Sequence, residues 1–169
     1  MKNLTIQNLN TARTCAIYKL MQSIIQTLSM EHAAFCKVFE QVERVLSATH
    51  STTEVQMLAS VVEGLLAGHG EMETNLAYAA LDHILADRGA LKQLYQDHHE
   101  IDDHFKRIHL ATDPAVALRL LKKALAATRE HFRREEKTIF PMLAKTLQPD
   151  TLWILGGQWK QPAAASVAT

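Results

Sequence analysis

Two pairs of side chains have the chemical types and the spacing to bind metal ions. Glu73 follows His69 by four residues in the stretch HGEME, and Glu135 follows His131 by four residues in HFRREE. Four residues advance an α-helix by slightly more than one turn, so the two side chains of each pair point the same way, about 6 Å apart along the axis. An imidazole and a carboxylate so placed can bind a single metal ion or an adjacent pair of ions.

An internal repeat adds two further histidines to these pairs. Residues 31–42 (EHAAFCKVFEQV) align with residues 97–108 (DHHEIDDHFKRI), with an acidic residue, a histidine and three apolar positions in common. The alignment matches His32 with His98 and thereby selects His98 rather than His99, a distinction that helical periodicity alone does not make. A repeated segment of this length indicates a duplicated supersecondary unit.

The second half of the repeat contains the two histidine–glutamate pairs themselves. Residues 69–81 align with residues 131–143, so that each pair occupies the same place in its half of the chain. Two helical hairpins of this kind, packed antiparallel, bring four histidines and two glutamates into the core near one level. The candidate metal ligands are His32, His69, Glu73, His98, His131 and Glu135.

These ligand types favour a di-metal site. Two carboxylates can bridge two ions while each ion takes two imidazoles, and a nitrogen and oxygen donor set without thiolates suits iron or manganese, with zinc or cobalt as alternatives. A buried carboxylate without a partner is costly, and two that face each other cost more, so metal charge is a natural compensation. The ions would keep open coordination positions for small molecules. No nucleophile triad, phosphate-binding loop or HExxH helix accompanies them.

The elements that must position these residues are predicted to be four long helices. Apolar residues recur with helical spacing through most of the chain, and the connections are short, which predicts an all-α, up-down-up-down four-helix bundle with a short C-terminal helix. We assign residues 1–147 to the bundle, with its core at about 13–147, and residues 148–169 to a short helix and a disordered tail. The predicted helices span about 13–47, 53–87, 90–111 and 114–147.

Glycine, proline and capping residues refine these bounds. Three glycines within residues 64–70 lower the helix propensity of the second segment and indicate close packing or a local irregularity there. A typical helix start lies at residues 112–114, with Asp113 or Thr112 as the cap and Pro114 at the first helical position. Asp150 is a candidate cap of the short C-terminal helix, which we expect to end at Gly156–Gly157.

The composition argues against several classes of function. The chain has 169 residues, enough for one domain with a sizeable core, and 18 basic residues balance 18 acidic ones. This balance leaves no net positive charge to attract nucleic acid or an anionic membrane, and no apolar run is long enough to span a membrane. Cys15 and Cys36 make no disulfide framework, and the N-terminus has no signal-peptide pattern. We therefore expect a cytoplasmic protein.

Four stretches of the chain resemble the haemerythrin-like proteins of the type called the HHE cation-binding domain. They are EHAAF (31–35), HGEME (69–73), DHHEID (97–102) and HFRREEKTIFPML (131–143), in this order, within a resemblance that covers about residues 20–147. The resemblance implies a four-helix bundle around two iron ions, bridged by carboxylates and by an oxo or hydroxo group. The implied ligands are the same six residues, with the two glutamates as bridges.

The chain departs from the oxygen-carrying haemerythrins at two ligand positions. Asp102 stands where those proteins have a second histidine of the third helix, and Glu136 stands where they have an aspartate, so that Glu135 is the carboxylate that fits. Asp102 remains a candidate ligand, as does Cys36, which the repeat aligns with Asp102. The sparser set resembles other branches of the family, including iron-centre repair proteins and iron- or oxygen-sensing domains.

These observations predict a non-haem di-iron protein that binds or senses O₂, NO or peroxide, or handles iron under such stress. The alternatives are an oxidoreductase or an iron-centre repair protein acting through the same site, a module that binds another divalent metal such as manganese or zinc, and a purely structural bundle. We assign no catalytic residue. Trp153 and Trp159 in the C-terminal segment could form a homo-oligomer contact or, more simply, cover the end of the bundle.

Overall fold

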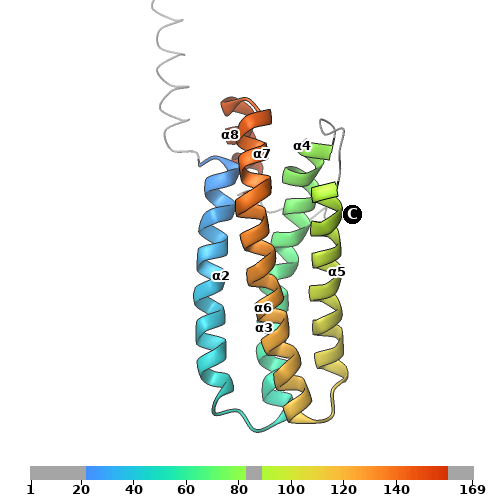
Figure 1. The fold of residues 1–169 in the computed structure, drawn as a ribbon. Helices are drawn as coiled ribbons and strands as arrows, with labels where there is room; N and C mark the ends of the chain where they lie inside the picture. Colours follow the sequence, from blue (N-terminus) through green and yellow to red (C-terminus); the bar gives the residue numbers. More distant parts are fainter. Residues whose placement is uncertain (1–21, 83–88, 160–169) are drawn as a thin grey trace, which may run out of the picture.

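The computed structural model describes residues 22–82 and 89–159 and shows an antiparallel four-helix bundle with a short fifth helix at one end (Figure 1). Within these ranges there is no strand. The elements are α2 (Ile24–Leu46), α3 (Thr52–Met72), η1 (Glu73–Tyr78), α4 (Ala79–Asp82), α5 (Gly89–Leu110), α6 (Pro114–Arg134), η2 (Glu135–Ile139), α7 (Phe140–Thr146) and α8 (Pro149–Trp159). The segments α3–η1–α4 and α6–η2–α7 are each one long helix, so the predicted all-α fold is confirmed.

Some predicted helix bounds are wrong, and others lie outside the described residues. The first helix begins at Ile24 with Ser23 as its cap, so the predicted helix through residues 22 and 23 is wrong. Residues 13–21 of that prediction lie outside the described residues, as do residues 83–87 of the second helix and the tail 160–169. Helix α8 begins at Pro149, which puts Asp150 in its first turn rather than at a cap, and it continues through both glycines to Trp159. The predicted end at Gly156–Gly157 is therefore wrong.

Side-chain caps explain why three of the long helices begin where they do. Ser23 and Ser51 each accept a hydrogen bond from the backbone N–H three residues later, and the side chains of Gln26 and Glu54 accept in return from the cap backbone. Asp113 caps α6 in the predicted way, with Pro114 at the first helical position. Such caps satisfy backbone groups that a helix start leaves without a partner.

Two apolar clusters fill the bundle, one on each side of a polar level. Along each long helix the members of one cluster come before the candidate ligands and those of the other cluster come after them, except that Phe132 of the turn cluster lies between His131 and Glu135. The turn cluster, near the α2–α3 and α5–α6 connections, contains Phe39, Val42, Leu46, Val55, Ala59, Val62, Ile101, Phe105, Ile108, Ala117, Leu120, Leu121, Ala124, Leu125 and Phe132. The α8 cluster contains Ile24, Leu28, Ala77, Tyr78, Leu81, Leu91, Leu94, Ile139, Phe140, Leu143 and Trp159.

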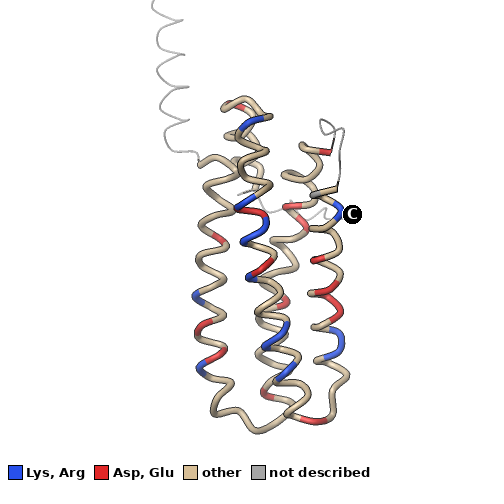
Figure 2. The backbone as a smooth tube through the Cα atoms, in the orientation of Figure 1, with Lys and Arg blue, Asp and Glu red and all other residues tan. Residues whose placement is uncertain are grey.

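Charged residues lie on the outside of the bundle except at the polar level. In Figure 2 acidic and basic residues are interspersed along the helices. Among the described residues no lysine or arginine is buried, and the buried acids are Glu73, Asp97 and Glu135. No helix in the described ranges has both the length and the apolar character needed to cross a membrane. The interior charge of the molecule is therefore concentrated where the candidate ligands are.

Helix α8 packs so closely on the start of α2 that the contact requires a glycine. A Cβ atom on Gly156 would lie 2.2 Å from the carbonyl oxygen of Gln22 and 2.8 Å from the backbone nitrogen of Ile24. Real Cβ atoms do not approach backbone atoms so closely, and backbone cannot yield as a side chain can. Any larger residue at this position must therefore move α8 away from α2.

We expect the substitution Gly156→Ala to lower the free energy of unfolding by about 1–3 kcal/mol, the usual cost of overpacking. Gly64→Ala is a matched control, because a Cβ atom at Gly64 meets nothing within 4 Å. Alanine in a helix is up to about 1 kcal/mol more favourable than glycine, so the control should be neutral or stabilising. Denaturant unfolding measures both. Equal stability of the two variants would contradict the close contact of α8.

Candidate metal centre

All six predicted ligands meet at the polar level between the two apolar clusters. Both glutamates have no exposed surface, and three of the four histidines are buried. The fourth histidine, His98 on α5, has a side chain that is 21% exposed. The residues are His32 on α2, His69 on α3, Glu73 on η1, His98 on α5, His131 on α6 and Glu135 on η2. Each long helix therefore contributes a histidine, as the repeat predicts.

The two carboxylate oxygens of Glu73 face two different pairs of histidines. Its Oε1 lies 2.9 Å from Nε2 of His69 and 3.5 Å from Nε2 of His32. Its Oε2 lies 3.5 Å from Nε2 of His98 and 3.8 Å from Nε2 of His131. A carboxylate with one oxygen toward each pair has the placement of a ligand that bridges two ions.

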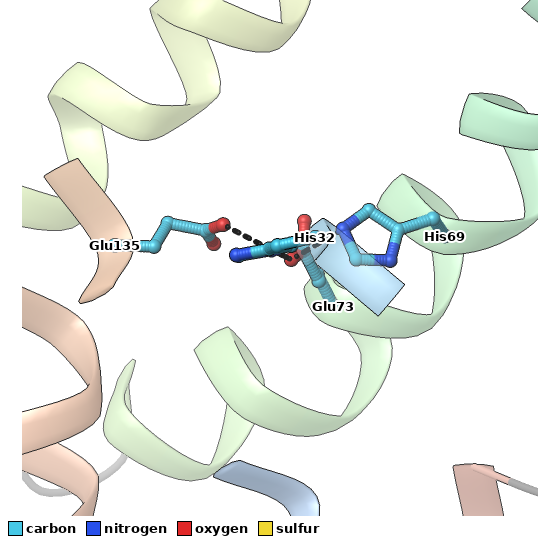
Figure 3. A group of neighbouring side chains, drawn as sticks. All are labelled: His32, His69, Glu73 and Glu135. Atoms are coloured by element: carbon cyan, nitrogen blue, oxygen red, sulfur yellow. Dashed lines mark ion pairs between the residues drawn. The ribbon is translucent and has the colours of Figure 1, made fainter. Parts of the chain in front are cut away.

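Glu135, at the start of η2, contributes the second carboxylate of the site. Its Oε2 is 3.3 Å from Nε2 of His32 and 3.5 Å from Nε2 of His131, one histidine from each pair. Its Oε1 accepts a hydrogen bond from the Tyr78 hydroxyl, which holds the carboxylate in place. Figure 3 shows Glu135 on the opposite side of the cluster from His69, with His32 and Glu73 between them.

The possible ligand atoms form two overlapping groups. One contains His32, His69, Glu73 and Glu135, and the other contains Glu73, His98 and His131, with the ligand atoms of each group within 4.8 Å of one another. Glu73 belongs to both groups. The geometry is therefore that of two adjacent cation sites that share a carboxylate.

Acidic residues on the outer side of the rings orient two of the histidines. Glu31 accepts a hydrogen bond from Nδ1–H of His69 at 2.8 Å, and Asp97 lies 3.5 Å from Nδ1 of His131. The repeat aligns Glu31 with Asp97, and each reaches the histidine of the next helix rather than the one beside it in sequence. The hydrogen bond to Glu31 fixes the ring orientation and the tautomer of His69, so that Nε2 is free to bind metal. The contact of Asp97 with His131 is electrostatic, without a hydrogen bond.

Glu136 contacts the outer nitrogen of a third histidine, His32, and orients its ring, a role that the sequence did not predict. Its Oε1 lies 3.0 Å from Nδ1 of His32, and the side chain is 46% exposed, whereas neighbouring Glu135 is fully buried. Arg134 donates to Asp97 and so extends the contact that orients His131. No spacing signal marks either residue, because both lie beside Glu135 in a run of charged side chains.

Both helices that carry a glutamate change to π-helix at that glutamate. The segment η1 begins at Glu73 and η2 begins at Glu135, at equivalent places of the repeat. π-Helical turns often occur at functional sites. The irregularity that the glycines suggested thus lies beyond them. A Cβ atom at Gly70 would make only ordinary van der Waals contact with the His98 ring, at 3.6 Å, and one at Gly64 or Gly68 would meet nothing within 4 Å.

Asp102 and Cys36, the two additional candidate ligands, lie outside both groups. Asp102 is exposed and lines a cavity on the side of α3 and α5. Cys36 is half-buried beside Arg129, and burial raises the pKa of its thiol. In the structure, therefore, neither side chain joins the cluster of histidines and glutamates.

A cavity of about 330 Å³ leads from the side of α3 and α5 to three of the histidines. It reaches His69, His98 and His131, and its walls are mainly apolar. The apolar and acidic lining includes Leu66, Ala67, Ile101, Phe105, Phe132, Glu63, Glu71 and Asp102. A small molecule can therefore approach the cluster without crossing either apolar core.

The family model described as Hemerythrin HHE cation binding domain matches residues 23–144. The chain belongs to this family. No curated protein and no solved structure matched significantly. All six clustered histidines and glutamates lie within the matched residues, and α8 lies beyond them. Membership of a cation-binding family and the buried cluster together indicate that this haemerythrin domain has a metal site.

The electrostatics of the haemerythrin domain show how strongly the cluster needs positive charge. Burial alone would lower the pKa of His32, but the nearby carboxylates of Glu135 and Glu73, 3.3 and 3.5 Å from its Nε2, outweigh it and raise that pKa to about 10. Burial also opposes a charged His69, yet the charge of Glu73 and the bond to Glu31 raise its pKa to about 9. Burial and the charge of Glu73 raise the pKa of Glu135.

The buried atoms that lack hydrogen-bond partners indicate that metal ions can replace the protons on the imidazoles of His32 and His69. Among the described residues, the buried atoms without a partner include Nε2 of His32 and of His69, both oxygens of Glu73 and Oε2 of Glu135. Unpaired buried polar atoms are uncommon and costly. Here they converge, and all are donors suited to iron, manganese or zinc. The residues present therefore fit a pair of divalent cations.

A metal-free haemerythrin domain should lose stability as the pH rises. The pKa values of His32 and His69 increase from an ordinary 6.5 to about 10 and about 9 in the fold. Their contribution to stability is complete below about pH 6.5 and is lost as the pH rises toward 10. Metal-loaded protein should lose less over this window, because the nitrogens bind metal instead of protons. Thermal unfolding of both forms measures the difference, and identical pH dependence would contradict the assignment.

Proposed function

We propose that this haemerythrin domain holds a non-haem di-iron centre and uses it to bind or sense O₂, NO or peroxide. The observation that supports the proposal most directly is the position of Glu73, one oxygen toward each pair of histidine nitrogens. One ion would take the nitrogens of His32 and His69, and the other would take those of His98 and His131. In this proposal Glu73 and Glu135 are the bridging ligands.

Iron supplies the chemistry of this proposal, since two ferrous ions can donate electrons to a small oxidant at an open coordination position. The chain supplies orientation. Glu31 and Glu136 hold the outer nitrogens of His69 and His32, which aims Nε2 of each ring inward. Asp97 lies 3.5 Å from the outer nitrogen of His131. Tyr78 holds Glu135 by donating to Oε1 and leaves Oε2 toward the histidines.

Apolar side chains exclude water from the proposed centre. The ring of Phe132 stacks on His32 at a centroid distance of 3.9 Å, and Phe140 stacks on the same ring at 5.6 Å. The cavity between α3 and α5 reaches three of the clustered histidines, and its mainly apolar walls favour small neutral molecules such as O₂, NO and hydrogen peroxide. The acidic residues at the cavity, Glu63 and Asp102, disfavour anions.

Metal analysis of two neighbouring glutamate variants tests the proposed ligand set. Wild-type protein should contain about two equivalents of iron, because the clustered donors form two groups. Glu135→Gln removes a proposed bridging ligand and should lower the iron content by one equivalent or more. Glu136→Gln leaves the proposed ligands in place and keeps an oxygen that can accept from Nδ1–H of His32, so it should retain both ions. Iron content is measured together with the near-ultraviolet absorption of the oxidised protein.

Other outcomes identify the alternatives. One equivalent of metal, or zinc from cells grown with ample iron, would indicate a different metal module. Full iron content in Glu135→Gln would contradict the ligand set. Sustained consumption of peroxide or NO by the reduced protein, lost in Glu135→Gln, would indicate an oxidoreductase rather than a binding protein.

The proposed approach of small molecules through the α3–α5 cavity has its own test. Ala67 is exposed and lines that cavity, so Ala67→Phe should narrow it and leave the fold and the metal content unchanged. We expect the association rate of NO with the reduced protein to fall several-fold, as measured by stopped-flow absorption. Ala34→Phe is the control, since Ala34 is exposed at the opening between α2 and α3. Equal rates in the two variants would contradict this route.

A further inference from the structure

Helix α8 lies outside the residues that match the family model and yet reaches the metal centre. It packs on the start of α2 at Gly156 and ends at Trp159, whose side chain is largely buried in the α8 cluster. The indole ring stands edge-on to the His69 ring, with 5.6 Å between the ring centroids. The last residue of α8 is therefore in contact with a proposed metal ligand.

A chain of hydrogen bonds connects the indole to the centre. Nε1–H of Trp159 donates to Oε1 of Glu31 at 2.7 Å. The other oxygen of Glu31 accepts from Nδ1–H of His69 at 2.8 Å, since a carboxylate can only accept here. Nε2 of His69 is in turn 2.9 Å from Glu73. Each donor and acceptor in this series fixes the orientation of the next.

The internal repeat explains why Glu31 needs a donor from elsewhere. Its counterpart Asp97 is held by Arg134, which follows His131 by three residues. The position three residues after His69 is Met72, which has no hydrogen-bond donor. In the first half of the repeat the donor to the acidic residue therefore comes from α8 instead of from the same hairpin.

Trp159 also lines the opening between α2 and α3. This opening, of about 360 Å³, is bounded by Glu31, Leu65, Gly68 and His69 together with the indole. The half-exposed Glu31 side chain, 34% accessible, faces it. Without the indole, water would compete for the oxygen that now accepts from Nε1–H.

We propose that Trp159 is a positioning residue of the metal centre, acting on His69 through Glu31, and that α8 thereby completes a site that the family domain alone leaves open. The proposal rests on the proposed function in one respect, the binding of metal by His69. The indole of Trp159 thereby holds Nε2 of His69 toward Glu73. Loss of the indole N–H should loosen that ligand and speed metal release.

Trp159→Phe tests this proposal, because it keeps an aromatic ring and removes the N–H donor. Outer contacts of a metal ligand typically change affinity by 10–100-fold, so we expect a chelator to extract iron at least about tenfold faster than from wild type. Trp153→Phe, an equivalent change six residues earlier on α8, is the control and should leave the rate unchanged. Equal extraction rates from Trp159→Phe and wild type would overturn the proposal while leaving the di-iron assignment intact.

A second measurement needs no metal. In the metal-free protein, nitrogen NMR should show a slowly exchanging Nδ1–H of His69 in wild type and in Trp153→Phe. We expect that proton to exchange at least several-fold faster in Trp159→Phe, and Glu31→Ala, which removes the acceptor, should have the same effect. A purely structural role of the indole would leave it protected in Trp159→Phe, which would overturn the proposal even if wild type bound no iron.

Discussion

Glu73 and Glu135 face each other inside the bundle without contact with solvent, and the rest of the site depends on how their charges are compensated. A buried carboxylate requires a counter-charge, and two at close range require it more. Without metal, protons on the surrounding imidazoles supply it, which is why the pKa values of His32 and His69 are raised. Two divalent cations would supply it more fully and would also give partners to the unpaired Nε2 atoms of His32 and His69 and to the unpaired oxygens of the two glutamates. The same constraint connects the stability of the protein to its proposed function.

Much of the fold and of the cluster could be predicted because the chain repeats a helical hairpin. Helical phase is local, so a histidine and a glutamate four residues apart must share a face wherever the helix is regular. The alignment of His32 with His98 then placed the remaining ligands without knowledge of the packing. The choice of Glu135 over Glu136 agrees with the burial of the first and the exposure of the second. Whether these residues bind metal stays a prediction that only a loaded protein can test.

Other features could not be predicted because they depend on contacts remote in sequence or on backbone details without a compositional signal. The π-helical segments begin at both glutamates, yet the residues that form them, ETNLAY and EEKTI, have little in common. The contact of Trp159 with Glu31 joins residues 128 positions apart and depends on the packing of α8 on α2. The glycine pair that predicted the end of α8 is instead part of it, since Gly156 permits that close packing.

The most direct test of the central claim is anomalous diffraction at the iron absorption edge from crystals of the iron-loaded protein. The account predicts two iron peaks within the bundle, one beside His32 and His69 and the other beside His98 and His131. Glu73 should contact both peaks. A single peak, or peaks at residues outside the cluster, would contradict it.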